Sequence, residues 1–192
     1  TGVGAHGASP HRGVDPIVLG SQIVMGLQTV VSRTLPPRRP GVITVGAFHS
    51  GTKHNIISDA AHLQLTVRSE SPEDRTLLLD GIRRVAENMG RVAGLPDELL
   101  PEVVVSEESV PPTLNDKVLA ERVMTLWNGH FGEGVLFSGE RLGMGAEDFP
   151  IFTIDPYIPS LYFAVGGTPL EDFARERACL LYTSPSPRDW LQ

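Results

Sequence analysis

The sequence predicts a protein of the α+β class, in which two helices cover one face of an antiparallel sheet. Stretches 16–33 and 72–90 repeat apolar residues at the three- and four-residue spacing of a helix. Stretches 41–48 and 61–68 have the composition and the alternation of strands. With the end of a strand near residue 1 and another at 102–106, the order through residue 110 is β-α-β-β-α-β.

The first helix is expected to begin at Pro16, because proline at the first helical position loses no hydrogen bond and Asp15 can cap it. It is expected to end near residue 33, ahead of two consecutive prolines. The face expected to pack on the sheet carries Leu19, Ile23, Leu27, Val30 and Val31.

The two central strands are predicted from different features. Stretch 41–48 is short and β-branched, and the turn residues Ser50 to Lys53 follow it. In the next strand apolar and polar residues alternate, which is typical of a strand with one buried face. The apolar set is Ala61, Leu63, Leu65 and Val67, and the polar set is His62, Gln64, Thr66 and Arg68.

The second helix has the clearest helical pattern in the chain. Ser71 can cap it, Pro72 can occupy its first position, and two acidic residues follow where the helix dipole favours negative charge. Gly90 and Gly94 are expected to end it. Its apolar stripe is Leu78, Ile82, Val85, Ala86 and Met89.

A proline pair at 111–112 marks the expected end of the first domain. Beyond it, Asn115 or Asp116 can cap a third helix, and the stretch 160–167 has the composition of a buried strand. A segment of about 60 residues is marginal as an independent domain. We therefore expect these residues to be part of a larger unit.

Composition excludes several classes of protein. The 192 residues are 41% apolar, which suits one good core or two small ones, and no stretch reaches the roughly 18 apolar residues of a membrane span. The net charge of −7 argues against a nucleic-acid partner. The single cysteine, Cys179, excludes an internal disulfide and is typical of a cytoplasmic protein.

The segment 179–192 breaks the pattern of the rest of the chain. Its beginning, CLLYTSPSPRD, resembles an in-frame translation of a sequencing adapter, so we expect the segment to be non-native. The alternative is an ordinary disordered tail rich in serine and proline. Both interpretations exclude it from the fold.

The opening loop, TGVGAHGASPHRGVDPI, is the candidate site. Its glycines fit the letters G-x-G-x-x-G, but Pro10 disfavours a helix starting at Gly7, and no acidic residue follows at the expected distance. His6 and His11 could be metal ligands, although a zinc site needs three or four. His6 could also simply bond a neighbouring carbonyl.

Three segments together resemble successive signatures of the M20 metallopeptidase family, most closely its amidohydrolase branch of hippurate hydrolases and N-acyl-amino-acid amidohydrolases. They are GAHGASPHRGVDPI, KHNIISDAAHLQLTVRS and GMGAEDF, in the order and rough spacing of that family. The resemblance implies a ferredoxin-like dimerisation (lid) domain at 1–110 with a truncated first strand. It also implies an incomplete C-terminal part of an α/β catalytic domain at 111–178.

The same resemblance implies a parent enzyme that hydrolyses the amide bond of N-acyl amino acids or similar small amides. Two divalent metal ions of the zinc, manganese, cobalt or nickel type would activate its water. The family's metal ligands have no counterpart here, so this chain is expected to be a fragment that binds no metal and is inactive alone. The implied partners are a small N-acylated amino acid or amide and a second copy in a homodimer, with no nucleic acid or membrane.

Site roles follow residue by residue from the matching motifs. His6 matches the histidine that contacts the oxyanion of the transition state across the dimer. Asn55 and Arg68 match positions that hold the substrate carboxylate, and guanidinium suits a carboxylate bidentately. Glu147 and the adjacent Asp148 match a loop facing the cleft, and Glu147 is assigned there to substrate binding. Ser58 replaces the family's usual proline, which weakens the local turn.

Alternatives to these roles are structural. Arg68 could be a surface strand residue paired with Glu70, and Glu147 with Asp148 could simply begin a helix. Four further histidines, His11, His49, His54 and His62, are expected at the surface or in turns. At the level of the chain, the alternatives are a non-catalytic ferredoxin-like dimerisation module, or a fragment of an M20 carboxypeptidase or dipeptidase.

Overall fold

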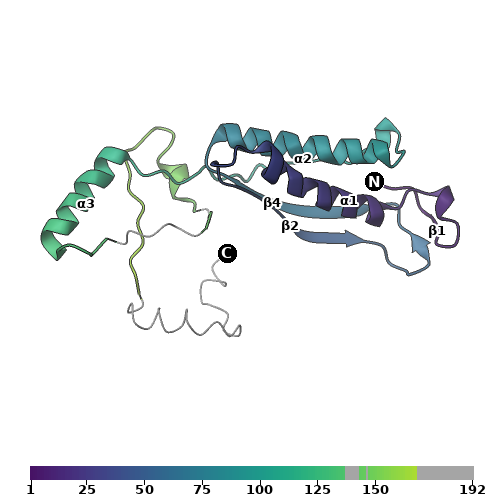
Figure 1. Ribbon diagram of the computed structural model, residues 1–192, viewed down its shortest axis with the longest axis horizontal. Helices are drawn as coiled ribbons and strands as arrows, with labels where there is room; N and C mark the ends of the chain where they lie inside the picture. Colours follow the sequence, from purple (N-terminus) through teal and green to yellow (C-terminus); the bar gives the residue numbers. More distant parts are fainter. Residues whose placement is uncertain (137–142, 146, 168–192) are drawn as a thin grey trace.

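The computed structural model describes residues 1–136, 143–145 and 147–167. Its N-terminal part is a two-layer α/β unit, drawn in purple to teal in Figure 1. Helices α1 (Pro16–Thr29) and α2 (Pro72–Val92) lie on one side of strands β2 (Gly41–Ser50) and β4 (Ala61–Ser69). The α+β class is confirmed.

Helix α1 begins as its sequence predicts. The Asp15 carboxylate accepts hydrogen bonds from the backbone N–H groups of Ile17 and Val18, at 2.8 and 3.4 Å. The helix then continues for one π-helical turn, η2 (Val30–Thr34), before Leu35 becomes extended ahead of the prolines. The expected end near residue 33 therefore falls inside this wider turn.

Strands β2 and β4 form an antiparallel ladder from the pair Gly41–Ser69 to the pair Ser50–Ala61. The register shifts between Val45 and Ala47, so Gly46 has no partner and forms a β-bulge. The alternation predicted for β4 is confirmed, because its apolar residues are half-buried and its polar residues at 62, 64 and 66 are exposed.

The core lies between the two helices and the β2–β4 ladder. Leu78 is 0% exposed and Leu27 and Val30 are each 1% exposed, so the two helical stripes meet as predicted. The helices approach closely where Gly81 faces Val30, since a Cβ on Gly81 would lie 2.5 Å from Val30 Cγ1. The buried cluster is Leu19, Ile23, Leu27, Val30, Ile43, Leu78, Ile82, Ala86 and Leu95.

The start of α2 contains a buried carboxylate. The Ser71 hydroxyl accepts the N–H of Asp74 at 3.1 Å and donates to the Asp74 carboxylate at 2.9 Å. Arg39 reaches that carboxylate from the loop before β2, at 3.0 Å. The hydrogen bond from Arg39 lowers the pKa of Asp74, burial opposes this, and Ser71 adds to the lowering.

The predicted single sheet is divided. Strands β1 (Ala5–His6) and β3 (Ile56–Ile57) pair only with each other in the described residues and form a second antiparallel ribbon. The strand predicted at 102–106 is wrong, because no ladder forms there. Val103 still packs against the core, although the backbone of this segment forms no ladder.

Short helical turns connect these elements. They are η1 (Pro10–Arg12) after β1 and η3 (Asp97–Leu99) after α2. Within the described residues, no helix is both long and apolar enough to cross a membrane.

The C-terminal part contains helix α3 (Lys117–Phe131) and the turn η4 (Phe149–Phe152), and Figure 1 shows α3 apart from the sheet. Asp116, one of the two predicted caps, accepts the N–H of Leu119 at 2.8 Å. The strand predicted at 160–167 is not formed in its described residues. Residues 179–192 lie outside the described residues.

Candidate functional site

The β1–β3 ribbon brings two of the predicted site residues together. His6 on β1 lies opposite Ile56 on β3, and Asn55 immediately precedes Ile56. The next residue, Gly7, donates its N–H to the Asn55 carbonyl at 2.8 Å. His6 and Asn55 are both exposed, so their side chains are open to a ligand.

Glycines allow this close approach of the backbones. A Cβ on Gly7 would lie 3.0 Å from the Asn55 carbonyl oxygen, and one on Gly4 would lie 3.3 Å from the Ile57 oxygen. Both distances are tighter than ordinary van der Waals contact, so a side chain at either position would push the ribbon apart. The glycines in the opening loop therefore serve ribbon packing.

The His6 ring has a defined hydrogen-bonding state. The backbone N–H of Ala8 donates to His6 Nδ1 at 3.1 Å. A neutral imidazole that accepts at Nδ1 carries its proton on Nε2. His6 therefore presents an N–H donor at Nε2. Because Nδ1 accepts a hydrogen bond, it does not donate one to a neighbouring carbonyl, which was the structural alternative.

An open hollow of about 440 Å³ lies beside His6. Ile56 and Ile57 supply apolar surface, and Asp59 supplies a carboxylate. The hollow is lined by Gly4, Ala5, His6, Thr52, Ile56, Ile57, Ser58 and Asp59. It can take a small molecule of mixed polarity, with one imidazole donor at its edge.

Arg68 lies at the opposite end of the β2–β4 ladder. It pairs with Val42, seven residues along β4 from Ala61, which corresponds to about 24 Å of strand. The β1–β3 ribbon lies beyond the Ala61 end (Figure 1). Arg68 and His6 of one chain therefore cannot contact the same small molecule.

The structural alternative for Arg68, an ion pair with Glu70 or another acid, is not observed either in the described part of the chain. The ion pairs within the described residues do not include Arg68. Its side chain is half-buried and lies on the polar side of β4, in line with His62, Gln64 and Thr66.

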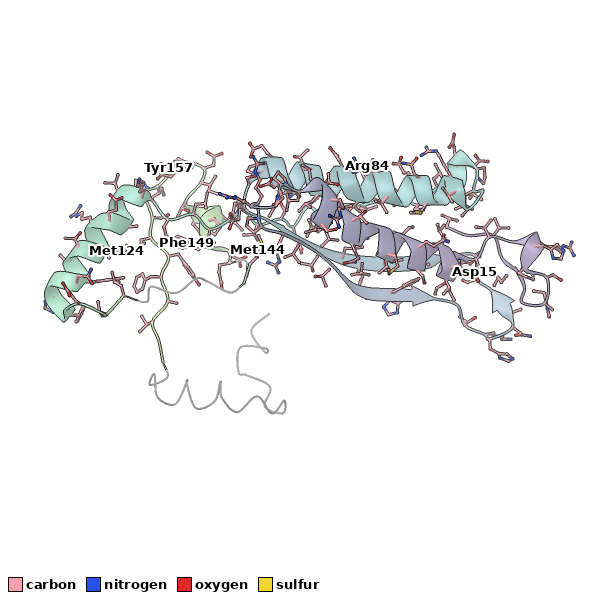
Figure 2. All side chains as sticks on the ribbon, viewed as in Figure 1. Asp15, Arg84, Met124, Met144, Phe149 and Tyr157 are labelled. Atoms are coloured by element: carbon pink, nitrogen blue, oxygen red, sulfur yellow. The ribbon has the colours of Figure 1, made fainter. Side chains whose placement is uncertain are left out.

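Glu147 lies in the C-terminal part, far along the chain from the ribbon, and is exposed. Asp148 occupies the N-cap position of η4, but its side chain makes no capping hydrogen bond. Figure 2 shows the neighbouring Phe149 and Met144 between α3 and the sheet. The structure thus does not bring Glu147 to His6 and Asn55.

A polar cluster that sequence reasoning missed joins α3 to the segment after η4. The Asn115 side chain pairs with the backbone of Tyr162 through both its amide nitrogen and its oxygen, at 3.0 and 2.7 Å. Tyr157 donates to the Asp116 carboxylate at 2.5 Å. This bond lowers the pKa of Asp116 and raises the pKa of Tyr157.

Two alternatives for the opening loop fail. The glycine fingerprint needs a strand before it and a helix opening within it, but β1 lies inside the motif and only the short turn η1 follows. The described residues contain no group of three or more histidine, cysteine, aspartate or glutamate side chains able to hold a metal ion. Among the described residues, His6 and His11 thus have no third ligand side chain beside them.

Comparison with known proteins identifies relatives for most of the chain. Residues 1–92 match the family model of the peptidase dimerisation domain. The chain is 34% identical to the N-acetyldiaminopimelate deacetylase of Leuconostoc citreum, over 77% of this chain and 37% of that protein. It is 33% identical to thermostable carboxypeptidase 2 of Saccharolobus solfataricus, over 86% of this chain and 39% of that protein.

A third relative and one solved structure extend the comparison. The hippurate hydrolase of Campylobacter jejuni is 30% identical over 79% of this chain and 38% of its own length. A crystal structure named as an aminohydrolase of methicillin-resistant Staphylococcus aureus matches with a TM-score of 0.67 and 28% identity, over 81% of this chain and 38% of that one. The chain thus spans less than two fifths of each relative.

Proposed function

The chain belongs to the M20 peptidase family through its dimerisation domain, residues 1–92, and from this we propose that it is part of a metal-dependent amidohydrolase. The proposed substrates are N-acyl amino acids or similar small amides. Two relatives named as a deacetylase and a hippurate hydrolase support this class. The chain would supply substrate-contacting groups and the surface for a second copy.

His6 is the proposed contact to the transition state. Hydrolysis of an amide passes through a tetrahedral intermediate whose oxygen carries negative charge, and a pre-placed donor stabilises it. The single observation that carries this assignment is the hydrogen bond from Ala8 to His6 Nδ1, which leaves the Nε2 proton as a fixed donor. His6 is exposed, which suits contact with a site on another chain.

Asn55 and Arg68 are the proposed contacts to the substrate carboxylate. Asn55 lies beside His6, whereas Arg68 lies about 20 Å or more away along β4. A site that uses all three side chains therefore needs two copies of the chain. We propose that His6 and Asn55 of one copy and Arg68 of the other contact the same substrate in a homodimer.

The metal ions of such an enzyme do not fit the described part of this chain, where no cluster of three or more ligand side chains occurs. We propose that two divalent ions, of the zinc, manganese, cobalt or nickel type, are held by residues outside it. They would supply an activated water. The described part of the chain would itself only bind and orient the substrate.

Residues 111–178 are proposed to be part of the catalytic domain, with Glu147 near the cleft. The exposed apolar residues of α3 support this, since Val118 is 75% exposed and Leu126 is 67% exposed. A helix with so much exposed apolar surface normally packs against another element. The boundary at residue 110 follows the end of the packed N-terminal unit.

An assay of the enzyme encoded by the longer reading frame tests the function. We expect hydrolysis of hippurate or N-acetylated amino acids, with loss of activity in a chelator and recovery on adding metal. Cleavage of peptides alone would favour a carboxypeptidase, which the Saccharolobus relative makes the second candidate. Folded, dimeric but inactive protein in every metal tested would favour a non-catalytic dimerisation module.

A further inference from the structure

Two histidines face each other on the open side of the main sheet. His49 on β2 and His62 on β4 are direct partners in the antiparallel ladder, and both are exposed. Helices α1 and α2 cover the other face of these strands (Figure 1). Cβ atoms of directly opposed residues lie about 4.5–5.5 Å apart. The two imidazoles therefore extend from neighbouring positions on the exposed face, within reach of a common ligand.

The bulge at Gly46 puts His49 on this face. Ile43 and Val45 point into the core, and strict alternation would send residues 47 and 49 inward as well. The extra residue shifts the pattern, so that Phe48 packs over Gly20 of α1 and His49 turns outward. The pairing of the two histidines thus depends on a specific local irregularity.

We propose that His49 and His62 form a two-imidazole chelate for a late first-row transition-metal dication. Such ions bind imidazole nitrogen at about 2.0–2.1 Å, so two nitrogens on one tetrahedral ion lie about 3.4 Å apart. Imidazoles on opposed Cβ atoms can reach that separation. Water fills the other positions, which agrees with the absence of a third ligand side chain among the described residues.

The other histidines of the described chain do not form an equivalent pair. His6 already accepts a hydrogen bond at Nδ1, and His130 packs edge-on against Phe131. His11 lies in the short turn η1, and His54 lies in the turn between β2 and β3. The proposed chelate differs from the metal centre of the proposed enzyme in ligands and in position.

The bound ion would cross-link β2 and β4 near the end of the ladder that lies closest to the β1–β3 ribbon. An ion that binds only the folded state stabilises it, and the melting temperature then rises with the logarithm of the free metal concentration. The net charge of the whole chain, −7, favours the approach of a cation over that of an anion.

Calorimetric titration of the 192-residue chain with nickel(II) chloride tests the proposal. We expect one ion per chain, and we expect His49→Ala or His62→Ala to weaken binding about 100-fold or more, because each variant removes the chelate. Copper(II) should bind more tightly than nickel(II). The metal-dependent rise in melting temperature should disappear in the same variants.

His54→Ala is the matched control, since it removes an exposed histidine from the same hairpin without touching the pair. Its binding should equal that of the unchanged chain. Weakening by only about twofold in His49→Ala and His62→Ala, or equal weakening in His54→Ala, would overturn the proposal. His49→Gln and His62→Gln repeat the measurement with larger side chains, and circular dichroism checks that each variant is folded.

Discussion

At the scale of single residues, the state of the His6 ring decides what this side chain can do. The ring accepts from Ala8 at Nδ1, and so offers a proton at Nε2. With its proton on Nε2, the ring is better placed to donate a hydrogen bond to a developing oxyanion than to act as a base that removes a proton. The type of residue and the motif were readable from the sequence, whereas the tautomer required the geometry of the turn.

The role that we propose for His6 predicts a specific kinetic loss. In the full-length enzyme, His6→Ala should lower kcat by about 10²–10³ with little change in KM, because the donor acts on the transition state. Ala8→Pro should give a smaller loss in kcat, since it leaves His6 in place but removes the N–H that fixes the ring. Steady-state kinetics on one amide substrate measures both, and an unchanged kcat in His6→Ala would reject the assignment.

Asp74 predicts how stability depends on pH. Arg39 lowers the pKa of this buried carboxyl in the folded state. The stabilisation is therefore fully present above the unfolded value near about 3.9, and it is lost as pH falls through the folded value. Urea unfolding from pH 7 down to pH 2 should show a steeper loss below about pH 4 in the unchanged chain than in Asp74→Asn.

The exposed pair Asp80–Arg83 supplies the control for this experiment. Its two side chains are 62% and 44% exposed, so water already solvates them and the pair adds little. Asp80→Asn should leave the pH dependence of unfolding as it was. An equal effect of the two substitutions would show that the acid sensitivity does not come from the buried carboxylate.

At the scale of elements, helix packing overrides local propensity at Gly81. Replacing glycine by alanine inside an open helix normally stabilises it by about 0.5–1 kcal/mol. Here the added Cβ would lie 2.5 Å from Val30 Cγ1, where the turn η2 at the end of α1 touches α2. We expect Gly81→Ala to lower the free energy of unfolding by about 1–3 kcal/mol, measured by urea denaturation.

Gly129 in α3 is the matched control for Gly81. A Cβ there meets no atom within 4 Å, so Gly129→Ala should not destabilise the chain. The double variant Gly81→Ala/Val30→Ala should be more stable than the sum of the two single changes, because the shorter side chain relieves the overlap. Strict additivity would mean that the two helices do not touch there.

The helices were the elements most readily predicted from sequence. Their caps at Asp15 and Ser71 and their apolar stripes are local features, and the structure confirms them. The strand predicted at 102–106 was wrong because a run of valines indicates a preference for extended backbone, whereas a strand also needs a backbone partner. The bulge at Gly46 was likewise invisible, since it depends on the register of two strands.

At the scale of the whole molecule, the predicted order of elements gave only a partial answer to which site residues lie close together. His6 and Asn55 meet because β1 and β3 pair. Arg68 is separated from them by the length of β4, which fixes its place at the far end of the domain. Residues from a shared motif set therefore need not meet within one chain, and a substrate site that used all three side chains would need two copies of it.

The two parts of the chain should also differ in whether they fold without the other part. The N-terminal unit has a closed core with Leu27 and Leu78 almost fully buried. In the C-terminal part, Leu126 and Phe131 on α3 are 67% and 65% exposed. We expect a shortened chain, residues 1–110, to keep the melting transition of the full chain, because the core is retained intact.

The same contrast predicts where a hydrophobic dye binds. The fluorescent probe ANS should bind the 192-residue chain and bind residues 1–110 much more weakly, because the exposed apolar surface of α3 is then absent. Leu126→Glu in the full chain should reduce dye binding without moving the melting temperature, whereas Leu27→Ala should cost about 2–5 kcal/mol of stability. If the shortened chain failed to melt cooperatively, the segment beyond residue 110 would be part of the folding unit, and the domain boundary would have to move.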